Sequence, residues 1–539
     1  MKKSTKLFMS LLSVLTITGN VLAMASCGGF KPADGSESTT TSESVVSPAP
    51  EASESVTSTA PEASESTSEA PEVSESTSEA PETSETPSKP SKPQETVAAY
   101  DGSKVTVSFY HTMGANLKAI LDKHIGKFKE IYPNITIEHQ SFGDYPGLRD
   151  QITTELAAGN SPSMAYCYPD HVALYNTAKA VMPLDAFIAS EAPVTKKGGS
   201  TEVMGLTQAQ IDDFVPIYYN EGKMFDDGLM YALPMLKSTE VLYYNKTVFA
   251  QKGYQVPTTW DEMEALCATI QADPDHKMVI PLGYDSESNW FITMTEQLGT
   301  PYTSAVEGQK FLYNTEENHA FVEKFRGWYD NAYVTTEEIN GGYTSDMFTA
   351  TDPNGIRSLM CIGSSAGASY QTPDKLEDGS YPFEVGVAMI PQVDPSNPKI
   401  ISQGPSLCMF KKSAQEMAAT WLFMEYLTTN VQCQAELSMN NGYTCAIQSV
   451  VDAKVYKDFL DKADGYGRLQ ATCILNTIAW KDHYFVSPAF NGSSAARDAV
   501  GKLIQTCFLN KPKKGQTMAQ FLKEKFDESI LGLEQIYGK

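Results

Sequence analysis

The segment 363–367, with the sequence GSSAG, has the residue spacing of a turn that exposes a nucleophilic serine. In hydrolases that use this turn, a strand precedes the serine and a long helix follows it. Here the chain reaches Pro373 and the polar residues 377–379 before a long helix can form, and His483 is the only histidine that follows. A hydrolase that uses Ser365 stays a remote alternative. A turn of small residues whose amides and hydroxyls face a ligand is the favoured interpretation.

Other patterns for catalysis or cofactor binding are missing from the sequence. It contains no GxxxxGK[ST] phosphate loop, no GxGxxG and no HExxH. Its seven histidines lack the spacing of metal ligands, and the acidic stretch 285–289 with Glu296 has Trp290 where a calcium loop requires a glycine. We therefore expect no metal, no cofactor and no catalytic residue.

Aromatic residues are the more informative group. The chain has 27 Tyr and 5 Trp, and Tyr145, Tyr168, Trp290 and Tyr443 stand beside residues typical of loops. A sugar ring stacks its C–H face on such a ring while its hydroxyls hydrogen bond to amides and carboxylates. Any one of these residues could be an ordinary core or surface side chain. As a set, they favour a carbohydrate ligand.

The charge of the chain excludes one class of partner. There are 41 Lys and Arg against 66 Asp and Glu, a formal charge of −25, and the excess of acid continues beyond residue 96. A surface of this sign repels a phosphate backbone, so we expect no nucleic-acid partner. At 539 residues the chain is also too long for one ordinary domain.

The first residues resemble an export signal. Residues 1–6 are basic and residues 7–25 are mainly apolar. The run ends in Met24-Ala25-Ser26-Cys27-Gly28, which resembles a bacterial lipoprotein cleavage box with Met24 where the pattern usually has Leu. We expect residues 1–27 to be a signal peptide and Cys27 to carry acyl chains at the outer face of the cytoplasmic membrane. An uncleaved anchor, or an ordinary signal with a chance cysteine, is the alternative.

A low-complexity segment follows the signal. Residues 28–98 are dominated by Ser, Thr, Glu, Pro and Ala, and a ten-residue unit begins at Ala60, Ala70 and Ala80. Such a segment has too little apolar surface to offset the entropy of ordering, so it predicts a disordered stalk. A passive adhesin that uses only this stalk is a rival hypothesis. The eight cysteines after Cys27 form no CxxC pair, and their pairing stays open.

The remaining residues, 99–539, have the pattern of an α/β protein. Apolar residues alternate in 105–109, follow helical spacing in 117–128 and alternate again in 135–137, with Pro133 between. This order predicts a strand, a helix and a strand within a parallel sheet. Capping boxes are predicted where helices begin after Thr259, Ser413 and Thr517. The length favours two lobes.

Several stretches then carry a resemblance to a known family. They are VTVSFYHTM (105–113), FGDY (142–145), LAAGNSPS (156–163), PLD (183–185), LPMLKSTEVLYYNK (233–246) and PTTWDE (257–262). They are similar to family 1 extracellular solute-binding proteins of ABC importers, whose members bind glycerol 3-phosphate, maltose and other oligosaccharides. The similarity runs from about residue 103 to near the C-terminus.

The resemblance implies a two-lobed, type II periplasmic-binding-protein-like fold with a ligand cleft at the hinge. Lobe 1 is expected at about 99–238 plus 391–440, and lobe 2 at about 239–390 plus 441–539. The first crossing is expected at 238–245 and a second near 387–391. It further implies a chain that is not an enzyme and that delivers its ligand to the permease of an ABC importer. We expect a monomer.

Matching positions one at a time gives the implied ligand site. The expected residues are His111, Tyr145, Asp170, Ser238, Trp290, Ser364 (or Ser365), Gly404 and Tyr443. Phosphate-binding members carry a basic residue in the C-terminal glycine-rich segment, whereas this chain has none in 488–492 and reaches one only at Arg497. This departure favours a neutral carbohydrate, because a dianion would lack an arginine fork. Glycerol 3-phosphate and its diesters remain the alternative.

Overall fold

The computed structural model describes residues 96–463 and 465–539, and all of them belong to one compact unit, 88–539. The predicted signal peptide, Cys27 and nearly all of the predicted stalk lie outside the described residues. Within the described part, no helix is long and apolar enough to cross a bilayer. The eight described cysteines are all buried free thiols.

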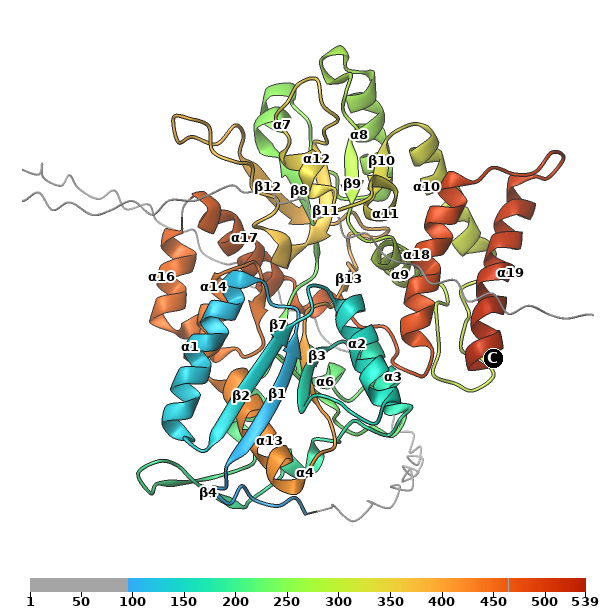
Figure 1. The fold of residues 1–539 in the computed structure, drawn as a ribbon. Coiled ribbons are helices and arrows are strands. Elements are labelled where there is room, and N and C mark those ends of the chain that lie inside the picture. Colours follow the sequence, from blue (N-terminus) through green and yellow to red (C-terminus); the bar gives the residue numbers. More distant parts are fainter. Residues whose placement is uncertain (1–95, 464) are drawn as a thin grey trace, which may run out of the picture. The chain divides into compact units, whose positions relative to one another are not determined.

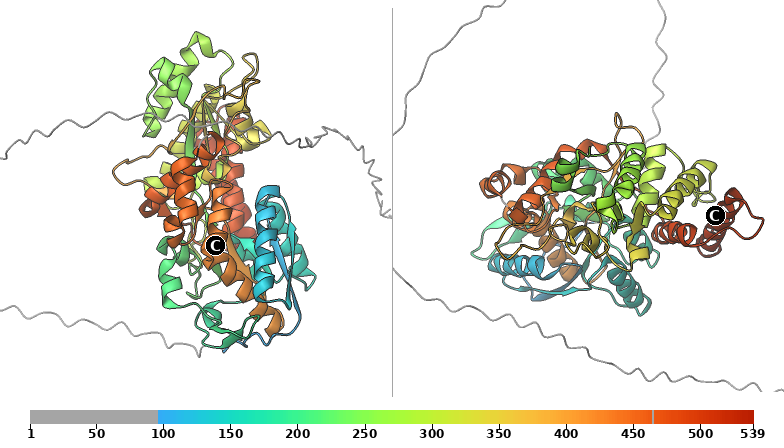
Figure 2. Two further views of the ribbon diagram at one scale, coloured as in Figure 1. Left: turned by 90° about the vertical axis from the view of Figure 1, so that its left-hand side faces the viewer. Right: turned by 90° about the horizontal axis from the view of Figure 1, so that it is seen from above.

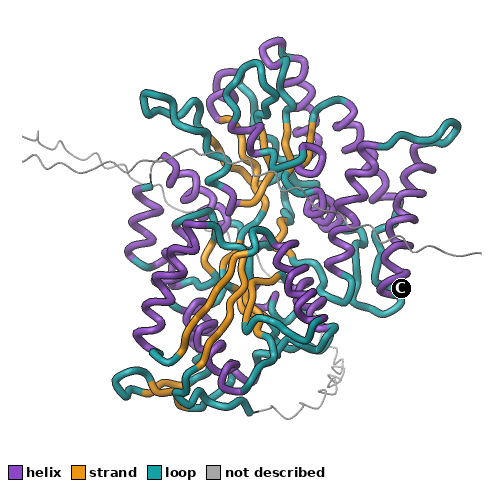
Figure 3. Tube along the Cα trace, in the orientation of Figure 1, coloured by secondary structure: helices purple, strands orange, loops and turns teal. Residues whose placement is uncertain are grey.

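Two separate five-stranded sheets organise the described part of the chain (Figures 1 and 3). The first has the order β2-β1-β3-β14-β6, and the second has the order β10-β9-β11-β8-β12. The strands of the first are β1 (Val105–His111), β2 (Ile135–Ser141), β3 (Met164–Cys167), β6 (Ala232–Pro234) and β14 (Ser406–Met409). Those of the second are β8 (Glu240–Asn245), β9 (Leu282–Tyr284), β10 (Val334–Thr336), β11 (Met360–Ser364) and β12 (Val385–Met389).

The predicted strand, helix and strand at the start of the first sheet are confirmed. β1 pairs in parallel with β2 from Val105↔Ile135 to His111↔Ser141, and α1 (Ala115–Ile131) connects the two strands. β14 joins this sheet antiparallel to β3, although some 240 residues separate them in the chain. The sheets are therefore mixed, and the first is completed by a segment that returns from far along the sequence.

Helices cover both sheets (Figures 1 and 2). Beside the first sheet lie α2 (Tyr145–Ala157), α3 (Pro169–Asn176), α4 (Asp185–Ile188), α5 (Gln208–Asp213), α6 (Pro216–Glu221), α13 (Ala414–Thr429), α14 (Val431–Met439), α15 (Ser449–Asp452) and α16 (Lys454–Lys462). With the second lie α7 (Lys246–Lys252), α8 (Trp260–Ala272), α9 (Glu287–Leu298), α10 (Glu316–Asp330), α11 (Glu337–Asn340), α12 (Ser345–Thr349), α18 (Ser493–Leu509) and α19 (Met518–Tyr537). Helix α17 (Gly465–Ala479) contributes to both sides, because Ile474 belongs to the core around the first sheet and Leu469 to a small cluster beside the second.

The remaining elements are short. They are the strands β4 (Pro193–Thr195), β5 (Thr201–Val203), β7 (Leu236–Lys237), β13 (Ile400–Ile401), β15 (Thr444–Cys445) and β16 (Tyr484–Phe485), and the 3₁₀ turns η1 (Pro274–His276), η2 (Ser365–Gly367) and η3 (Lys481–His483).

The predicted helix starts are largely confirmed. Thr259 and Thr517 form complete capping boxes at α8 and α19. Ser413 also caps its helix by accepting from the Glu416 amide at 3.3 Å. The Glu416 carboxylate, however, accepts instead from Ser163 Oγ at 2.7 Å, so it ties α13 to the edge of β3 rather than closing a box.

Two large hydrophobic cores, one around each sheet, define the lobes. The lobe limits stay a prediction, but the cores favour two changes to them. Ile400 and Ile401 pack in the second core, so we place the segment 391–402 with lobe 2. Cys445, Val450 and Tyr456 pack in the first core, whereas Tyr484 and the residues after it pack in the second. On this basis we place the segment 441–478 with lobe 1.

The hinge consists of two crossing segments that lie antiparallel. Ser238 and Gln403 exchange two backbone hydrogen bonds, with N···O distances of 3.0 and 2.9 Å, and the amide of Leu236 donates to the carbonyl of Pro405. The second crossing is therefore at 403–405. The expectation of a return near 387–391 was wrong, because β12 stays paired with β8 inside the second sheet.

Gly404 allows this close approach. Its φ is +94°, and a Cβ there would lie 2.5 Å from the Leu236 carbonyl oxygen and 2.8 Å from Lys237 Cα. Gly253 also has a positive φ, of +71°, but a Cβ there would meet nothing within 4 Å. A comparison of substitutions at these two glycines therefore separates the cost of a strained backbone from the cost of steric crowding.

We predict that Gly404→Ala destabilises the protein by more than 3 kcal/mol, because it adds a backbone clash to the ~1 to 2 kcal/mol cost of a left-handed alanine. Gly253→Ala should lose only that smaller amount. Urea unfolding of both variants measures the difference. Equal losses would show that the crossing segments are not tightly packed at Gly404.

Candidate functional site

A small cavity of about 40 Å³ lies where the two lobes meet at the hinge. Lobe 1 contributes Tyr168, Asp170 and Glu221 to its wall, and lobe 2 contributes Tyr302 and Arg497. A cavity of this volume holds a few water molecules. A ligand of several atoms therefore needs the lobes to separate before it can enter.

The lobe 1 wall follows from helix starts at the carboxyl edge of the first sheet. Asp144 caps α2 by accepting from the Gly147 amide at 2.7 Å, which places Tyr145 in the first turn. Tyr168 directly follows β3 and is the N-cap of α3, with Pro169 and Asp170 in the first turn. Loops at the carboxyl ends of the strands are the usual place for ligands in α/β folds.

Several buried polar atoms around this cavity have no hydrogen-bond partner among the described residues. Asp170 Oδ2 and the Tyr302 hydroxyl belong to residues that line the cavity, and the Tyr145 hydroxyl and the His171 Nδ1 atom belong to residues packed against Tyr168 in its wall. Buried polar groups are nearly always paired, because an unpaired one costs about 1 to 3 kcal/mol. Unpaired polar atoms that face one cavity from both of its walls are the expected property of a surface that hydrogen bonds a polar ligand.

Aromatic rings lie beside these polar atoms. The ring centroids of Tyr145 and Tyr168 are 4.5 Å apart, and those of Tyr168 and His171 are 5.3 Å apart. Burial raises the pKa of Tyr145 well above its ordinary value, with further contributions from Tyr168 and Tyr443. Burial also raises the pKa of Tyr168 and of Tyr443. These phenols are therefore neutral at physiological pH, so each can donate one hydrogen bond.

Arg497 is the residue that the sequence analysis missed. It belongs to the first turns of α18, half-buried in the cavity wall, and its Nη1 donates to Asn289 Oδ1 at 2.7 Å. Among the described residues, no salt bridge within 4.0 Å joins it to Asp170, which lines the same cavity from lobe 1. The sequence did not point to Arg497, because the glycine-rich segment where a basic residue was expected ends at Gly492, and four residues of α18 separate Gly492 from Arg497.

Asp170 lines the cavity, Tyr145 packs against the lining residue Tyr168, and Tyr443 lies next to Tyr145. The structure places Ser238 and Gly404 in the hinge beside the cavity. At Gly442, next to Tyr443, a Cβ would lie only 1.8 Å from the Ser365 carbonyl oxygen. The lobes are thus in direct backbone contact at this point.

Ser364 and Ser365 form the turn that follows β11. Ser364 Oγ accepts from the Ala366 amide at 3.2 Å and caps η2. Ser365 is fully buried, and its Oγ accepts from the Thr239 amide at 3.3 Å. No histidine of the described segments is hydrogen bonded to Ser365, so the arrangement needed for a serine nucleophile is not formed.

His111 lies away from the cavity. It is the last residue of β1 and is fully buried, with its Nε2 atom 2.8 Å from His139 Nδ1. Burial lowers the pKa of His111 to about 3. Its neutral ring is engaged inside lobe 1.

The prediction that Trp290 contacts the ligand is contradicted by its burial. The side chain has 0% exposure in the second core, stacked at 4.7 Å and 14° on Tyr284 and packed at 4.2 Å against Phe325. Both of its faces are covered, because α9 turns the Trp290 side chain toward the sheet. A loop-like local sequence had suggested exposure, yet the residue lies in a helix.

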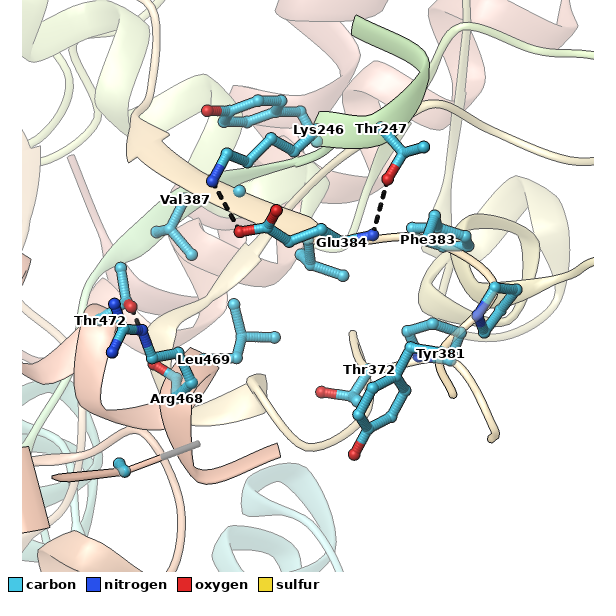
Figure 4. A pocket seen from close by; sticks show the side chains of 16 residues that line it. Lys246, Thr247, Thr372, Tyr381, Phe383, Glu384, Val387, Arg468, Leu469 and Thr472 are labelled. Atoms are coloured by element: carbon cyan, nitrogen blue, oxygen red, sulfur yellow. Dashed lines mark hydrogen bonds and ion pairs between the residues drawn. The ribbon is translucent and has the colours of Figure 1, made fainter. Parts of the chain in front are cut away.

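A larger groove of about 800 Å³ lies beside the edge strand β12 (Figure 4). Tyr381, Glu384 and Arg468 line it, and Lys246 Nζ lies 2.6 Å from Glu384 Oε1. None of the predicted site residues contributes to this groove. We assign the candidate site to the smaller cavity, because Asp170 of lobe 1 and Tyr302 of lobe 2, each with a buried polar atom that lacks a partner among the described residues, both line it.

Together, the two sheets, the antiparallel hinge and the cavity between them define a two-lobed α/β binding protein. Residues 123–461 match the family model described as "Bacterial extracellular solute-binding protein". This is more than half of the chain, and the chain belongs to this family, whose members are solute-binding proteins of importers and not enzymes.

Individual relatives are distant. The sn-glycerol-3-phosphate-binding periplasmic protein UgpB of Escherichia coli (strain K12) is 24% identical over 378 residues, which cover 67% of this chain and 78% of that protein. UgpB from Mycobacterium tuberculosis in complex with glycerophosphocholine has a TM-score of 0.60 at 16% identity, covering 80% of this chain and 98% of its own. The maltose-bound T. maritima MalE3 has a TM-score of 0.59 at 16% identity, covering 79% and 99%. At these identities the solved structures support the fold alone.

An ion pair joins the lobes away from the hinge. Arg149 of α2 donates from Nη1 to Asp498 of α18 at 3.0 Å and to Ser494 Oγ at 3.1 Å. The Arg149 side chain is 15% exposed and that of Asp498 is 43% exposed, so solvent weakens the pair. It adds a modest preference for the lobes being in contact.

We predict that Arg149→Ala shifts the ligand-free protein about threefold toward separated lobes, since a partly exposed pair contributes at most about 1 kcal/mol. The distance between spin labels on the two lobes measures this shift. Lys246→Ala is the matched control, because its pair with Glu384 lies within one lobe. An identical distance distribution in both variants would contradict this role for Arg149.

Proposed function

We propose that this solute-binding protein captures a neutral carbohydrate in the cleft between its lobes and delivers it to the permease of an ABC importer. The observation that carries the proposal is that Asp170 Oδ2 and the Tyr302 hydroxyl, on opposite walls of the cavity, have no hydrogen-bond partner among the described residues, with the Tyr145 hydroxyl in the same condition behind Tyr168. Neutral phenols can donate to ligand hydroxyls while the Asp170 carboxylate accepts from them. The paired rings of Tyr145 and Tyr168 provide an apolar surface beside these groups.

The proposal includes the place where the protein works. The lipoprotein-like Cys27 would hold the chain at the outer face of the cytoplasmic membrane, and residues 28–98 would act as a tether for a monomeric binding unit. Ligand binding would favour the state with the lobes in contact, which is the state that a permease could distinguish.

A second candidate is a glycerol phosphate or a glycerophosphodiester. One observation favours it: Arg497 lines the cavity, although the sequence had offered no cation there. Its relatives named as sn-glycerol-3-phosphate-binding proteins point the same way. A guanidinium can hydrogen bond either to phosphate oxygens or to sugar hydroxyls, so the two candidates share one site.

We predict that Asp170→Asn weakens binding of the true ligand at least tenfold, because a charged hydrogen bond contributes about 1.5 to 3 kcal/mol. Isothermal titration with maltose, maltotriose, sn-glycerol 3-phosphate and glycerophosphocholine measures the effect. Tyr381→Ala, which removes a ring from the groove beside β12, is the control and should leave binding unchanged. Loss of binding in Tyr381→Ala with full binding in Asp170→Asn would move the site to the groove.

Arg497→Gln separates the two ligand classes. It should abolish measurable binding of a phosphate ligand, because Arg497 is the only cation that lines the cavity among the described residues. A neutral sugar should lose about tenfold or less, since it loses only neutral acceptor contacts. Unchanged affinity for every ligand would exclude Arg497 from the site.

A further inference from the structure

Glu221 is a second carboxylate in the wall of the cavity, in addition to Asp170. It is the last residue of α6 and is 2% exposed. Its Oε2 atom accepts from Lys237 Nζ at 2.9 Å and from Ser402 Oγ at 3.1 Å. Among the described residues, no hydrogen bond reaches its Oε1 atom. Because a buried carboxylate oxygen is nearly always hydrogen bonded, Oε1 is an acceptor that the cavity wall offers to a ligand.

Lys237 compensates the charge of Glu221 without lining the cavity. The Lys237 side chain has no exposed surface, and its ammonium donates to Glu221, to Ser406 Oγ at 3.1 Å and to the Gly404 carbonyl at 3.4 Å. These three bonds use all of its N–H groups, and Lys237 is not among the described residues that line the cavity. Glu221 therefore presents a strong acceptor to the cavity, while the ion pair as a whole is neutral.

The other charges of the cavity wall also sum to zero. The described lining holds three charged side chains, and apart from Glu221 these are Asp170, which is negative, and Arg497, which is positive. An anionic ligand would add negative charge that no group of this lining balances, and an uncompensated charge away from water is costly. A neutral ligand adds no charge, and its hydroxyls can donate to both carboxylates.

We propose that Glu221 is a ligand-contacting residue that sets specificity: its Oε1 atom accepts a hydrogen bond from a hydroxyl of a neutral, polyhydroxylated ligand, while Lys237 compensates its charge. The inference rests on the proposed function, because it concerns the same cleft. Glu221 lies outside the short motifs that resemble the family. One side chain thus has two roles, since Oε2 fastens the hinge and Oε1 binds the ligand.

This contact makes the protein selective for a free hydroxyl at the position that faces Glu221. A ligand in which that hydroxyl is missing or methylated would leave Oε1 buried without a donor, which costs more than the loss of one hydrogen bond between neutral groups. Selection of this kind does not depend on the aromatic rings of Tyr145 and Tyr168, which contact the ligand by stacking.

The test uses double variants, because a single substitution of Glu221 would leave the Lys237 charge buried without a partner. Glu221→Leu with Lys237→Met removes both charges and the acceptor. Glu221→Gln with Lys237→Met also removes both charges but keeps a carbonyl oxygen that can accept from a hydroxyl. Replacement of both partners of a buried pair by neutral side chains of similar volume is often tolerated, so we expect both variants to fold.

Isothermal titration with maltose, maltotriose and sn-glycerol 3-phosphate measures the affinity of each variant. We expect the Leu variant to bind a sugar about tenfold more weakly than the Gln variant, because only the Leu variant leaves a ligand hydroxyl without an acceptor. An ion pair that serves the hinge alone would give both variants the same affinity. Glu287→Gln is the matched control and should bind as the wild type does, because Glu287 is a buried carboxylate that bonds the Glu338 amide and does not line the cavity.

The outcomes separate the inference from the proposed function. Equal affinity of the two double variants for a sugar that the wild type binds would overturn the contact and leave the binding function in place. Tighter binding of sn-glycerol 3-phosphate than of either sugar would overturn the neutral class of ligand. If the wild type bound no member of the panel, the proposed function would fail, and a structure without ligand then decides the inference. The same structure decides it if either double variant does not fold.

That measurement is a crystal structure of the wild-type chain at a resolution that shows ordered water. We expect a water molecule in the cavity within about 3.2 Å of Glu221 Oε1, because an unused acceptor that faces a polar cavity is hydrated. An Oε1 atom that is bonded to a protein donor, or that has no water within this distance, would overturn the proposal.

Discussion

The hinge depends on one buried ion pair. Lys237 has no exposed surface, and its ammonium donates to Glu221 Oε2 at 2.9 Å, to Ser406 Oγ at 3.1 Å and to the Gly404 carbonyl at 3.4 Å. All three of its N–H groups are thus used. Removing one partner of such a pair leaves an uncompensated charge away from water, which costs about 3 to 5 kcal/mol. The two crossing segments are therefore fixed against each other at this point.

The Lys237–Glu221 ion pair also fixes the position of one residue of the cavity wall. Glu221 receives a second hydrogen bond from Ser402 Oγ at 3.1 Å and lines the cavity between the lobes. Around this fixed point, Tyr168 and Asp170 approach from one lobe and Tyr302 and Arg497 from the other. Because the hinge segments are short and tightly bonded, small rotations about them change the distance between these two walls more than the geometry within either wall.

Aromatic residues serve two purposes in this molecule, and local sequence does not separate them. Tyr145 and Tyr168 lie at helix starts at the edge of the first sheet, with their ring centroids 4.5 Å apart beside the cavity. Trp290 and Tyr284 stack inside the second core, where they stabilise lobe 2 by burial. The difference arises from which face of a helix meets the sheet, and this is a property of packing rather than of neighbouring residue types.

The sequence by itself was sufficient for what depends on local periodicity and local hydrogen bonds. The β1, α1 and β2 unit, the capping boxes at Thr259 and Thr517, the two-lobed α/β class and the first hinge crossing could all be predicted. Tyr145, Asp170 and Tyr443 could be put forward as ligand-site residues because they stand in short motifs that resemble those of the family, and their contact with a ligand stays a prediction. These features can be predicted because each depends on the pattern of residues within a short stretch of the chain.

Only the tertiary structure decided what depends on distant segments meeting. The second crossing at 403–405 is defined by its pairing with Ser238, some 165 residues earlier, and no local pattern marks it. Arg497 reaches the cavity because α18 packs across from α3, and Trp290 is withdrawn because α9 turns it into the core. Which side chains are buried, which charges pair and which residues line the cavity all depend on how distant segments pack together. They cannot be predicted from the sequence of any one segment.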